Sequence, residues 1–277
     1  MRIPYLPNRP RSFIKCAGGK TKLLPELMKR VPEKFGMYHE PFVGGGALFF
    51  ALASAERIRL ACLNDANQHL VDAYCVVRDE LPEVLRRLAL AENTQKFFDW
   101  VRAIDPDTLN GMQRAVRFLY LNRTCFNGLH RVNKKGKFNV PFGRYKTLRF
   151  DEENFRACSN ALRLAFISRG DFESTNHPKP RPGDLVYLDP PYLPASKTSD
   201  FTSYTADGFG WKDHLRLAAY AADLKQRGVH VIVSQGASDE IRILYREFGF
   251  KVDVVHAPRS VNSKGTGRGP VEEFVIS

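Results

Sequence analysis

The chain has 277 residues and a formal net charge of +12, with 43% hydrophobic and 26% charged residues, as in an ordinary globular protein. This composition excludes a disordered chain, a collagen-like repeat and a small disulfide-stapled fold, and the absence of any run of about 18 apolar residues predicts no membrane span. Five scattered cysteines without a Cys-x-x-Cys pair indicate reduced thiols in a cytoplasmic protein, with neither zinc nor disulfides.

The N-terminal part of the chain has the pattern of half a dinucleotide-type βαβ unit. An apolar run over 38–43 ends in Gly44-Gly45-Gly46 and is followed by a helix-like segment over 47–52. A second strand is predicted over 58–63, and it ends at Asn64-Asp65. An acid at this place can bind the ribose hydroxyls of an adenosine-containing ligand, whereas a lone Asp is more often a helix cap. The pair of motifs favours adenosine binding.

The middle of the chain is helical and strongly basic. Apolar spacings predict helices over 68–90 and 95–120, and turn signals predict loops and a hairpin over 126–145. Between residues 108 and 150 there is no Asp or Glu, but there are ten Lys or Arg, interleaved with aromatic residues. A solvated basic face is the simpler explanation for a short run. For a run of this length, a nucleic-acid partner is the better hypothesis.

The α/β alternation then resumes. The patterns predict helices over 154–166, 212–227 and 238–248, strands over 185–188 and 229–234, and a closing hairpin from 251–256 and 272–276. We therefore expect one α/β domain made from both ends of the chain, with a helical, basic insertion between them.

The most specific motif follows the apolar strand over 185–188. This strand delivers Asp189-Pro190-Pro191-Tyr192 to the carboxyl edge of the sheet, where α/β proteins bind ligands. Asp189 and the Pro190 carbonyl are hydrogen-bond acceptors, and Tyr192 offers a flat stacking face. Two acceptors beside an aromatic ring suit a planar base with an exocyclic amine, although a rigid turn is the alternative.

A second glycine-rich segment, Ala17-Gly18-Gly19-Lys20-Thr21, is similar to the end of a phosphate-binding loop. The full loop pattern fails because Ile14 stands where its first glycine is required. The nucleotide triphosphatase hypothesis is therefore poor. Lys20 can still hold a carboxylate or phosphate of a ligand.

Taken together, these motifs closely resemble the Dam-type DNA adenine methylases. The resemblance covers almost the whole chain and includes the segments 13–20, 40–46, 119–123, 127–129, 138–145, 189–192 and 259–261. It implies a Rossmann-like S-adenosylmethionine-dependent methyltransferase sheet with an inserted, mainly helical target-recognition domain that carries a β-hairpin. Residues 1–66 and 151–277 would form the catalytic domain, and residues 67–150 the target-recognition domain.

The same resemblance assigns site residues. Cofactor-binding positions are Cys16, Lys20, Phe42, Gly44, Gly46, Asp65 and Asp189, and the catalytic positions are Asp189, Pro190 and Tyr192. DNA-binding positions are Lys15, Asn127, Leu129, Arg131, Lys134, Lys137, Arg144 and Tyr145. Position 16 is aromatic in the best-known members, so Cys16 is a departure from the family pattern.

The implied activity is methyl transfer from S-adenosyl-L-methionine to N6 of a flipped-out adenine within G-A-T-C. The product would be S-adenosyl-L-homocysteine, no metal is implied, and double-stranded DNA is the partner, with no membrane and no obligate protein partner. Two alternatives stay open: another acceptor (cytosine N4, RNA or a protein amide), and a non-catalytic DNA-binding protein that keeps the cofactor fold. Asp rather than Asn before Pro190 argues against the first, and intact Lys20, Asp65 and Asp189 argue against the second.

Overall fold

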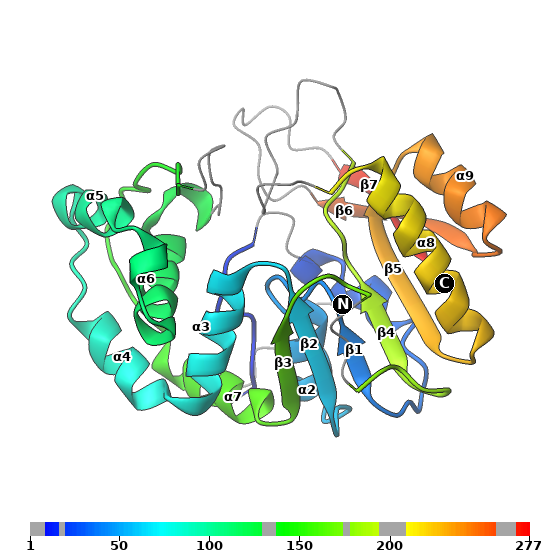
Figure 1. Ribbon diagram of the computed structural model, residues 1–277, viewed down its shortest axis with the longest axis horizontal. Helices are drawn as coiled ribbons and strands as arrows, with labels where there is room; N and C mark the ends of the chain where they lie inside the picture. The colour runs from blue at the N-terminus through cyan, green and yellow to red at the C-terminus, as the bar shows by residue number, and fades with distance from the viewer. Residues whose placement is uncertain (1–8, 17–19, 129–136, 174–177, 194–208, 259–269) are drawn as a thin grey trace.

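A computed structural model describes residues 9–16, 20–128, 137–173, 178–193, 209–258 and 270–277. Its centre is a seven-stranded sheet in the order β3-β2-β1-β4-β5-β7-β6 (Figure 1). β7 is antiparallel to both of its neighbours, and the other neighbouring pairs are parallel. The α/β class that the sequence predicts is therefore confirmed. The strands are β1 (Tyr38–Glu40), β2 (Ala61–Asp65), β3 (Ala165–Arg169), β4 (Leu185–Leu188), β5 (His230–Gly236), β6 (Val252–Pro258) and β7 (Pro270–Ile276).

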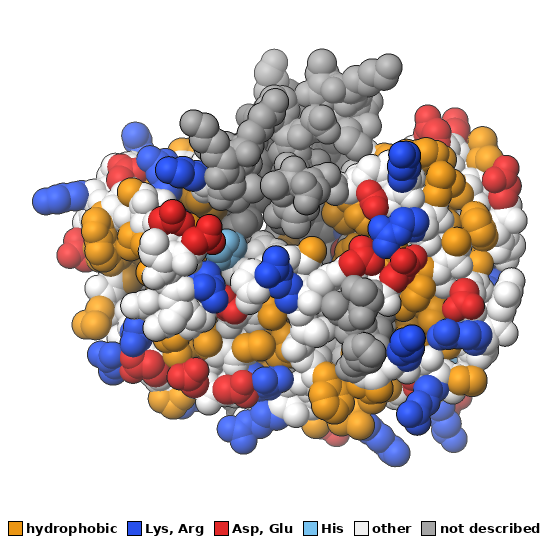
Figure 2. Space-filling model, in the orientation of Figure 1, with side chains coloured by type: hydrophobic (Ala, Val, Ile, Leu, Met, Phe, Trp, Pro, Cys, Tyr) orange, Lys and Arg blue, Asp and Glu red, His pale blue; other side chains and the backbone are white. Residues whose placement is uncertain are grey.

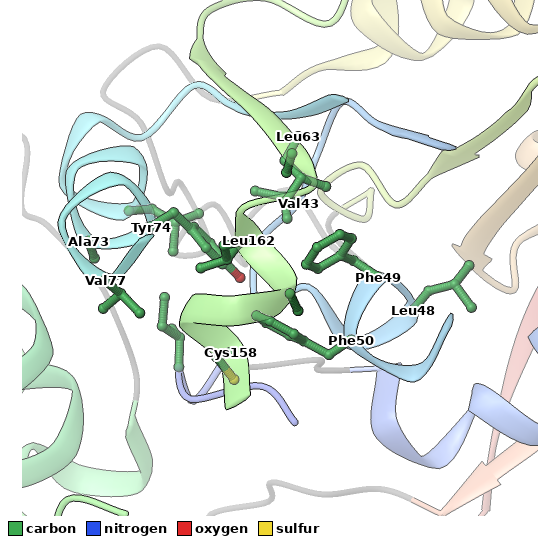
Figure 3. Close-up of a cluster of buried hydrophobic side chains, with 14 of the residues drawn as sticks. Val43, Leu48, Phe49, Phe50, Leu63, Ala73, Tyr74, Val77, Cys158 and Leu162 are labelled. Carbon is green, nitrogen blue, oxygen red and sulfur yellow. The ribbon is translucent and has the colours of Figure 1, made fainter. Parts of the chain in front are cut away.

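Helices cover both faces of this sheet because its strands alternate their side chains between two cores. In β4, Leu185 and Tyr187 join one buried cluster, and Val186 and Leu188 join the other. The first cluster packs against α1 (Leu24–Met28), α2 (Ala47–Ser54), α3 (Gln68–Asp79) and α7 (Glu152–Leu162); Figure 3 shows part of it, with Phe49, Tyr74 and Leu162 among its labelled residues. The second packs against α8 (Trp211–Gln226) and α9 (Asp239–Glu247).

Three helices lie beyond the β3 edge of the sheet (Figure 1). They are α4 (Leu81–Ala89), α5 (Gln95–Ala103) and α6 (Gly111–Thr124), with the 3₁₀ turn η2 (Pro106–Thr108) between α5 and α6. α6 packs against α3, so these helices share the first buried cluster with the sheet. Asn110 begins α6 with a capping box, in which its side chain and that of Gln113 each accept the other residue's backbone N–H.

The main error of the sequence interpretation is the helix predicted over 154–166. α7 ends at Leu162, and Ala165 already begins β3. This strand lies at the sheet edge and leaves Phe166 52% exposed, so it lacks the burial pattern that identifies a strand. The helix predicted over 68–90 is also two helices, because Pro82 stands in the first turn of α4. The closing hairpin is confirmed as β6 and β7, while residues 129–136 of the loops and hairpin predicted over 126–145 lie outside the described residues.

Candidate active site

The candidate site lies at the carboxyl ends of β1, β2 and β4. From β1 the chain proceeds to β2 and β3 on one side of the sheet, and from β4 it proceeds to β5 on the other. In open α/β sheets, ligands bind at the point where the strand order reverses in this way. The glycine turn after β1, Asp65 at the end of β2 and the Asp-Pro-Pro-Tyr segment after β4 therefore meet at one edge.

The glycine turn and Asp65 contact each other directly. The backbone N–H of Gly44 donates to Asp65 Oδ2 at 3.0 Å, and that of Asn67 donates to Asp65 Oδ1 at 2.9 Å. Burial raises the pKa of Asp65, and these backbone donors oppose the rise. The carboxylate is thus held in a fixed orientation beside the turn.

Two glycines of this turn serve different purposes. Both Gly44 and Gly46 have positive φ, 46° and 62°, a conformation that favours glycine. A Cβ on Gly46 would lie 2.9 Å from the Tyr74 hydroxyl, so packing requires glycine there. On Gly44, a Cβ would meet no described atom within 4 Å, which leaves open space for a ligand beside this backbone.

Lys20 connects the N-terminal glycine segment to the Asp-Pro-Pro-Tyr segment. It begins the 3₁₀ turn η1 (Lys20–Lys22), is only 6% exposed, and places its Nζ 2.8 Å from Asp189 Oδ1. Ser234 in β5 donates its hydroxyl to the same oxygen at 2.9 Å. Because both contacts use Oδ1, neither occupies the second oxygen of Asp189.

Tyr192 is held close to the same lysine. The Nζ of Lys20 lies 4.6 Å from the centre of the Tyr192 ring, within cation–π range. The Tyr192 hydroxyl donates to Glu273 Oε2 at 3.0 Å. Burial, with Asp189 and Glu273 nearby, raises the pKa of Tyr192 well above its ordinary value, so this hydroxyl stays protonated. Pro190, which lies between Asp189 and Tyr192 in the chain, is buried.

Cys16 and Phe42 form parts of the wall around the turn. A Cβ added to Gly45 would lie 3.4 Å from the Cys16 sulfur, so this sulfur borders the glycine turn. Burial, Asp65 and Asp189 raise the pKa of the Cys16 thiol to about 12, which keeps it neutral. Phe42 packs against Phe172, with ring centres 5.4 Å apart.

The sequence interpretation missed Phe172 and Glu273. Phe172 is 2% exposed and follows β3. The glycine and acid before it, Gly170 and Asp171, are a strand-end signal that the misassigned helix concealed. Glu273 lies 81 residues from its partner Tyr192, and no local pattern indicates such a contact.

Three predicted DNA-binding residues lie together on the helical side. The Nζ of Lys15 lies 4.7 Å from the centre of the Tyr145 ring, and the backbone N–H of Asn127 donates to the Tyr145 hydroxyl at 3.0 Å. Asn127 belongs to the 3₁₀ turn η3 (Phe126–Gly128) and has a φ of 56°. Lys137 and Arg144 are exposed. Leu129, Arg131 and Lys134 lie outside the described residues.

The buried side chain of Asn122 ties Lys15 to the turn η3. Its Oδ1 accepts from the backbone N–H of Lys15 at 2.9 Å, and its Nδ2 donates to the carbonyls of Lys15 and Gly128 at 2.7 and 3.2 Å. Asn122 is 4% exposed. A single amide therefore fixes the N-terminal segment against α6 and η3.

Part of the basic segment stabilises the helices. Arg114 forms an ion pair with Asp72 at 2.7 Å, Arg117 donates to the carbonyls of Val101 and Arg102 near the end of α5, and Arg123 donates to the carbonyl of Arg149. On the face shown in Figure 2, Lys and Arg side chains are interspersed with Asp and Glu. The charge excess along the sequence thus overstates the number of cations available to a phosphate backbone.

Comparison with known proteins identifies the family. The model for D12 class N6 adenine-specific DNA methyltransferases matches residues 17–260. The type II methyltransferase M1.LlaDCHI of Lactococcus lactis subsp. cremoris is 38% identical over 276 residues, covering 96% of this chain and 95% of that protein. The DNA adenine methylase of Escherichia coli (strain K12) is 34% identical over 272 residues, covering 97% of this chain and 95% of that protein. The chain therefore belongs to the N6 adenine-specific DNA methyltransferases of the D12 class, as the resemblance predicts.

Two kinds of feature are absent from the described residues. No described helix is both long and apolar enough to cross a membrane. The described His, Cys, Asp and Glu side chains include no cluster of three or more that could hold a metal ion.

Proposed function

We propose that this protein transfers a methyl group from S-adenosyl-L-methionine to N6 of an adenine in duplex DNA, within the sequence G-A-T-C. The observation that carries the proposal is the ion pair between Lys20 and Asp189. It joins the Asp-Pro-Pro-Tyr segment to the N-terminal segment that holds Lys20, at the point where open α/β sheets bind their ligands. The cofactor product would be S-adenosyl-L-homocysteine. The substrate would be DNA, and the protein would act in the cytoplasm.

The residues around the glycine turn fit an adenosine-containing cofactor. S-adenosylmethionine supplies the electrophilic methyl group. The open space beside Gly44 admits a ligand to the backbone, and Asp65 retains lone pairs that accept hydrogen bonds from the ribose hydroxyls. Phe42 and the neutral thiol of Cys16 offer apolar surface, while Gly46 maintains the shape of the turn.

Asp189, Pro190 and Tyr192 are assigned to the target adenine. The base must leave the helix stack before a methyl group can reach N6. Tyr192 stacks on the displaced base, while Asp189 Oδ2 and the Pro190 carbonyl accept the two N6 hydrogens. The N6 lone pair is delocalised into the ring, and two acceptors favour a more tetrahedral nitrogen that can attack the methyl carbon and then release one N6 proton to solvent. Positioning and electrostatics then supply most of the rate enhancement.

The helical part is assigned to DNA recognition, with residues 67–150 as the target-recognition domain and residues 1–66 and 151–277 as the catalytic domain. Lys15 and Tyr145, which already contact each other, support this assignment because one supplies charge and the other a flat ring. The remaining DNA-binding residues are Asn127, Leu129, Arg131, Lys134, Lys137 and Arg144.

The test is methyl transfer from labelled S-adenosylmethionine to unmethylated DNA, followed by location of the modified base. N6-methyladenine within G-A-T-C is expected, and Asp189→Ala should abolish it while the circular dichroism spectrum stays unchanged. N6-methyladenine at other sequences would overturn the G-A-T-C assignment only. No transfer by a protein that binds both cofactor and DNA would overturn the catalytic proposal.

A further inference from the structure

Two residues that face each other across β5 and β7 both contact Tyr192. Gly236 and Glu273 are register partners in this antiparallel pair, so both positions point to the same side of the sheet. The Glu273 carboxylate accepts a hydrogen bond from the Tyr192 hydroxyl, with 3.0 Å between Oε2 and the hydroxyl oxygen. A Cβ on Gly236 would lie 3.0 Å from Cδ2 and 3.4 Å from Cγ of the Tyr192 ring.

Gly236 is needed for space and not for its backbone conformation. Other glycines, such as Gly44 and Gly46, have positive φ, but Gly236 lies in a regular strand without one. A glycine inside a strand loses conformational entropy and packs nothing, so it usually marks a close approach of another group. Here that group is the ring of Tyr192, which would have to shift if position 236 carried a side chain.

Glu273 holds the other end of the ring. Tyr192 follows two prolines, whose rings fix their own φ angles and stiffen the chain that leads to it. The side-chain torsions of Tyr192 then set the plane of its ring. A hydrogen bond at the hydroxyl and close packing along one side of the ring restrict those torsions. Lys20, with its Nζ 4.6 Å from the ring centre, adds a third contact.

We infer that Gly236 and Glu273 form a tyrosine seat that fixes the plane of Tyr192 before DNA arrives, and so determine how well a displaced adenine is stacked. This inference rests on the proposed function. Both are positioning residues, since neither is placed against the substrate or cofactor. Through Glu273, the tyrosine seat assigns a role in the reaction to the antiparallel strand β7. The glycine turn and the Asp-Pro-Pro-Tyr segment, in contrast, follow the parallel strands β1 and β4.

The test compares Gly236→Ala, Glu273→Ala and Glu273→Gln with two controls. Glu272→Gln changes the neighbouring exposed carboxylate, and Gly210→Ala adds a Cβ whose nearest described neighbour is 3.9 Å away. The readouts are the single-turnover rate, the fluorescence of 2-aminopurine at the target position, and cofactor affinity by calorimetry. We expect Gly236→Ala and Glu273→Ala to slow transfer by about 10-fold. In the first variant the ring must shift by a few tenths of an ångström, in the second it loses the partner of its hydroxyl, and a misplacement of about 1 Å costs about 100-fold.

The pattern across the readouts separates positioning from general damage. Cofactor affinity should stay within about twofold in every variant, the 2-aminopurine signal should change in the two slow variants, and Glu273→Gln should recover most of the rate because its amide oxygen still accepts the tyrosine hydroxyl. Wild-type rates and signals in Gly236→Ala and Glu273→Ala would overturn the inference.

The wild-type protein in the same assay tests the proposed function separately. If it transfers no methyl group to adenine, that function fails, and the seat is then judged from the NMR signal of ring-labelled Tyr192, assigned with Tyr192→Phe. A shifted or broadened signal in Gly236→Ala and Glu273→Ala supports the seat, and an unchanged signal overturns it.

Discussion

Removal of the Asn122 amide should lower both the stability of the protein and its affinity for DNA. The amide makes three hydrogen bonds: two partly buried ones with both backbone groups of Lys15 and a buried one with the carbonyl of Gly128. At about 1 kcal/mol for each such bond, Asn122→Ala should lower the free energy of unfolding by about 3 kcal/mol. Asn110→Ala, which removes an exposed cap of the same helix, should cost only about 1 kcal/mol.

Asn122→Asp distinguishes hydrogen bonding from packing, because Asp has the same shape as Asn. It keeps an acceptor for the Lys15 N–H but turns an oxygen toward two carbonyls, so at pH 8 it should destabilise the protein at least as much as Asn122→Ala. Urea unfolding measures the three stabilities, and fluorescence anisotropy measures DNA affinity. If Asn122→Asp is as stable as the wild type, or Asn122→Ala loses no more than Asn110→Ala, the reasoning is refuted.

Four further outcomes are expected. Asp65→Asn should weaken cofactor binding about 10- to 100-fold in calorimetry, because charge-assisted hydrogen bonds are lost; unchanged affinity would remove Asp65 from the cofactor site. Burial lowers the pKa of His214 to about 4. Between pH 6.5 and 4, this imidazole is therefore protonated in the unfolded chain but neutral in the folded protein. The free energy of unfolding should therefore fall by about 3 kcal/mol between pH 6.5 and 4, an effect that His214→Gln should reduce and exposed His230→Gln should not. With a pKa of about 12, Cys16 should resist alkylation at pH 8 until the protein unfolds, as mass spectrometry of the native and denatured protein would show. Lys137→Ala should reduce the slope of log affinity against log salt by about 1, and an unchanged slope would mean that Lys137 contacts no phosphate.

Local patterns predicted the parts of the site that lie on contiguous segments. The strand, glycine turn and acid ending in Asp65, and the strand leading to Asp189, are visible because hydrophobic periodicity and strand-end polar residues coincide there. The parallel sheet then brings these strand ends to one edge, so their proximity follows from the fold class.

The parts that were missed depend on contacts across long stretches of chain or on weak periodicity. Glu273 contacts Tyr192 across a sequence separation of 81 residues, and Asn122 contacts Lys15 across 107. No local sequence pattern indicates either contact. The predicted helix ran into the first two residues of β3, and the rest of this strand was not predicted, because β3 is short, lies at the sheet edge and exposes Phe166. The charge count of the basic segment includes Arg114, whose ion pair with Asp72 no local sequence pattern indicates.

The position of β7 between β5 and β6 has a consequence for the order of folding. β6 hydrogen-bonds only to β7 within the described sheet, although it precedes β7 in the chain. While the ribosome is still making residues 270–276, β6 can form no part of the sheet, and β5 remains an open edge with unpaired backbone groups. Strand β7, which is made after both of its neighbours, therefore completes two pairings at once, and non-local pairings of this kind are slow to form. Until then, the nascent protein exposes an unpaired strand edge to other chains.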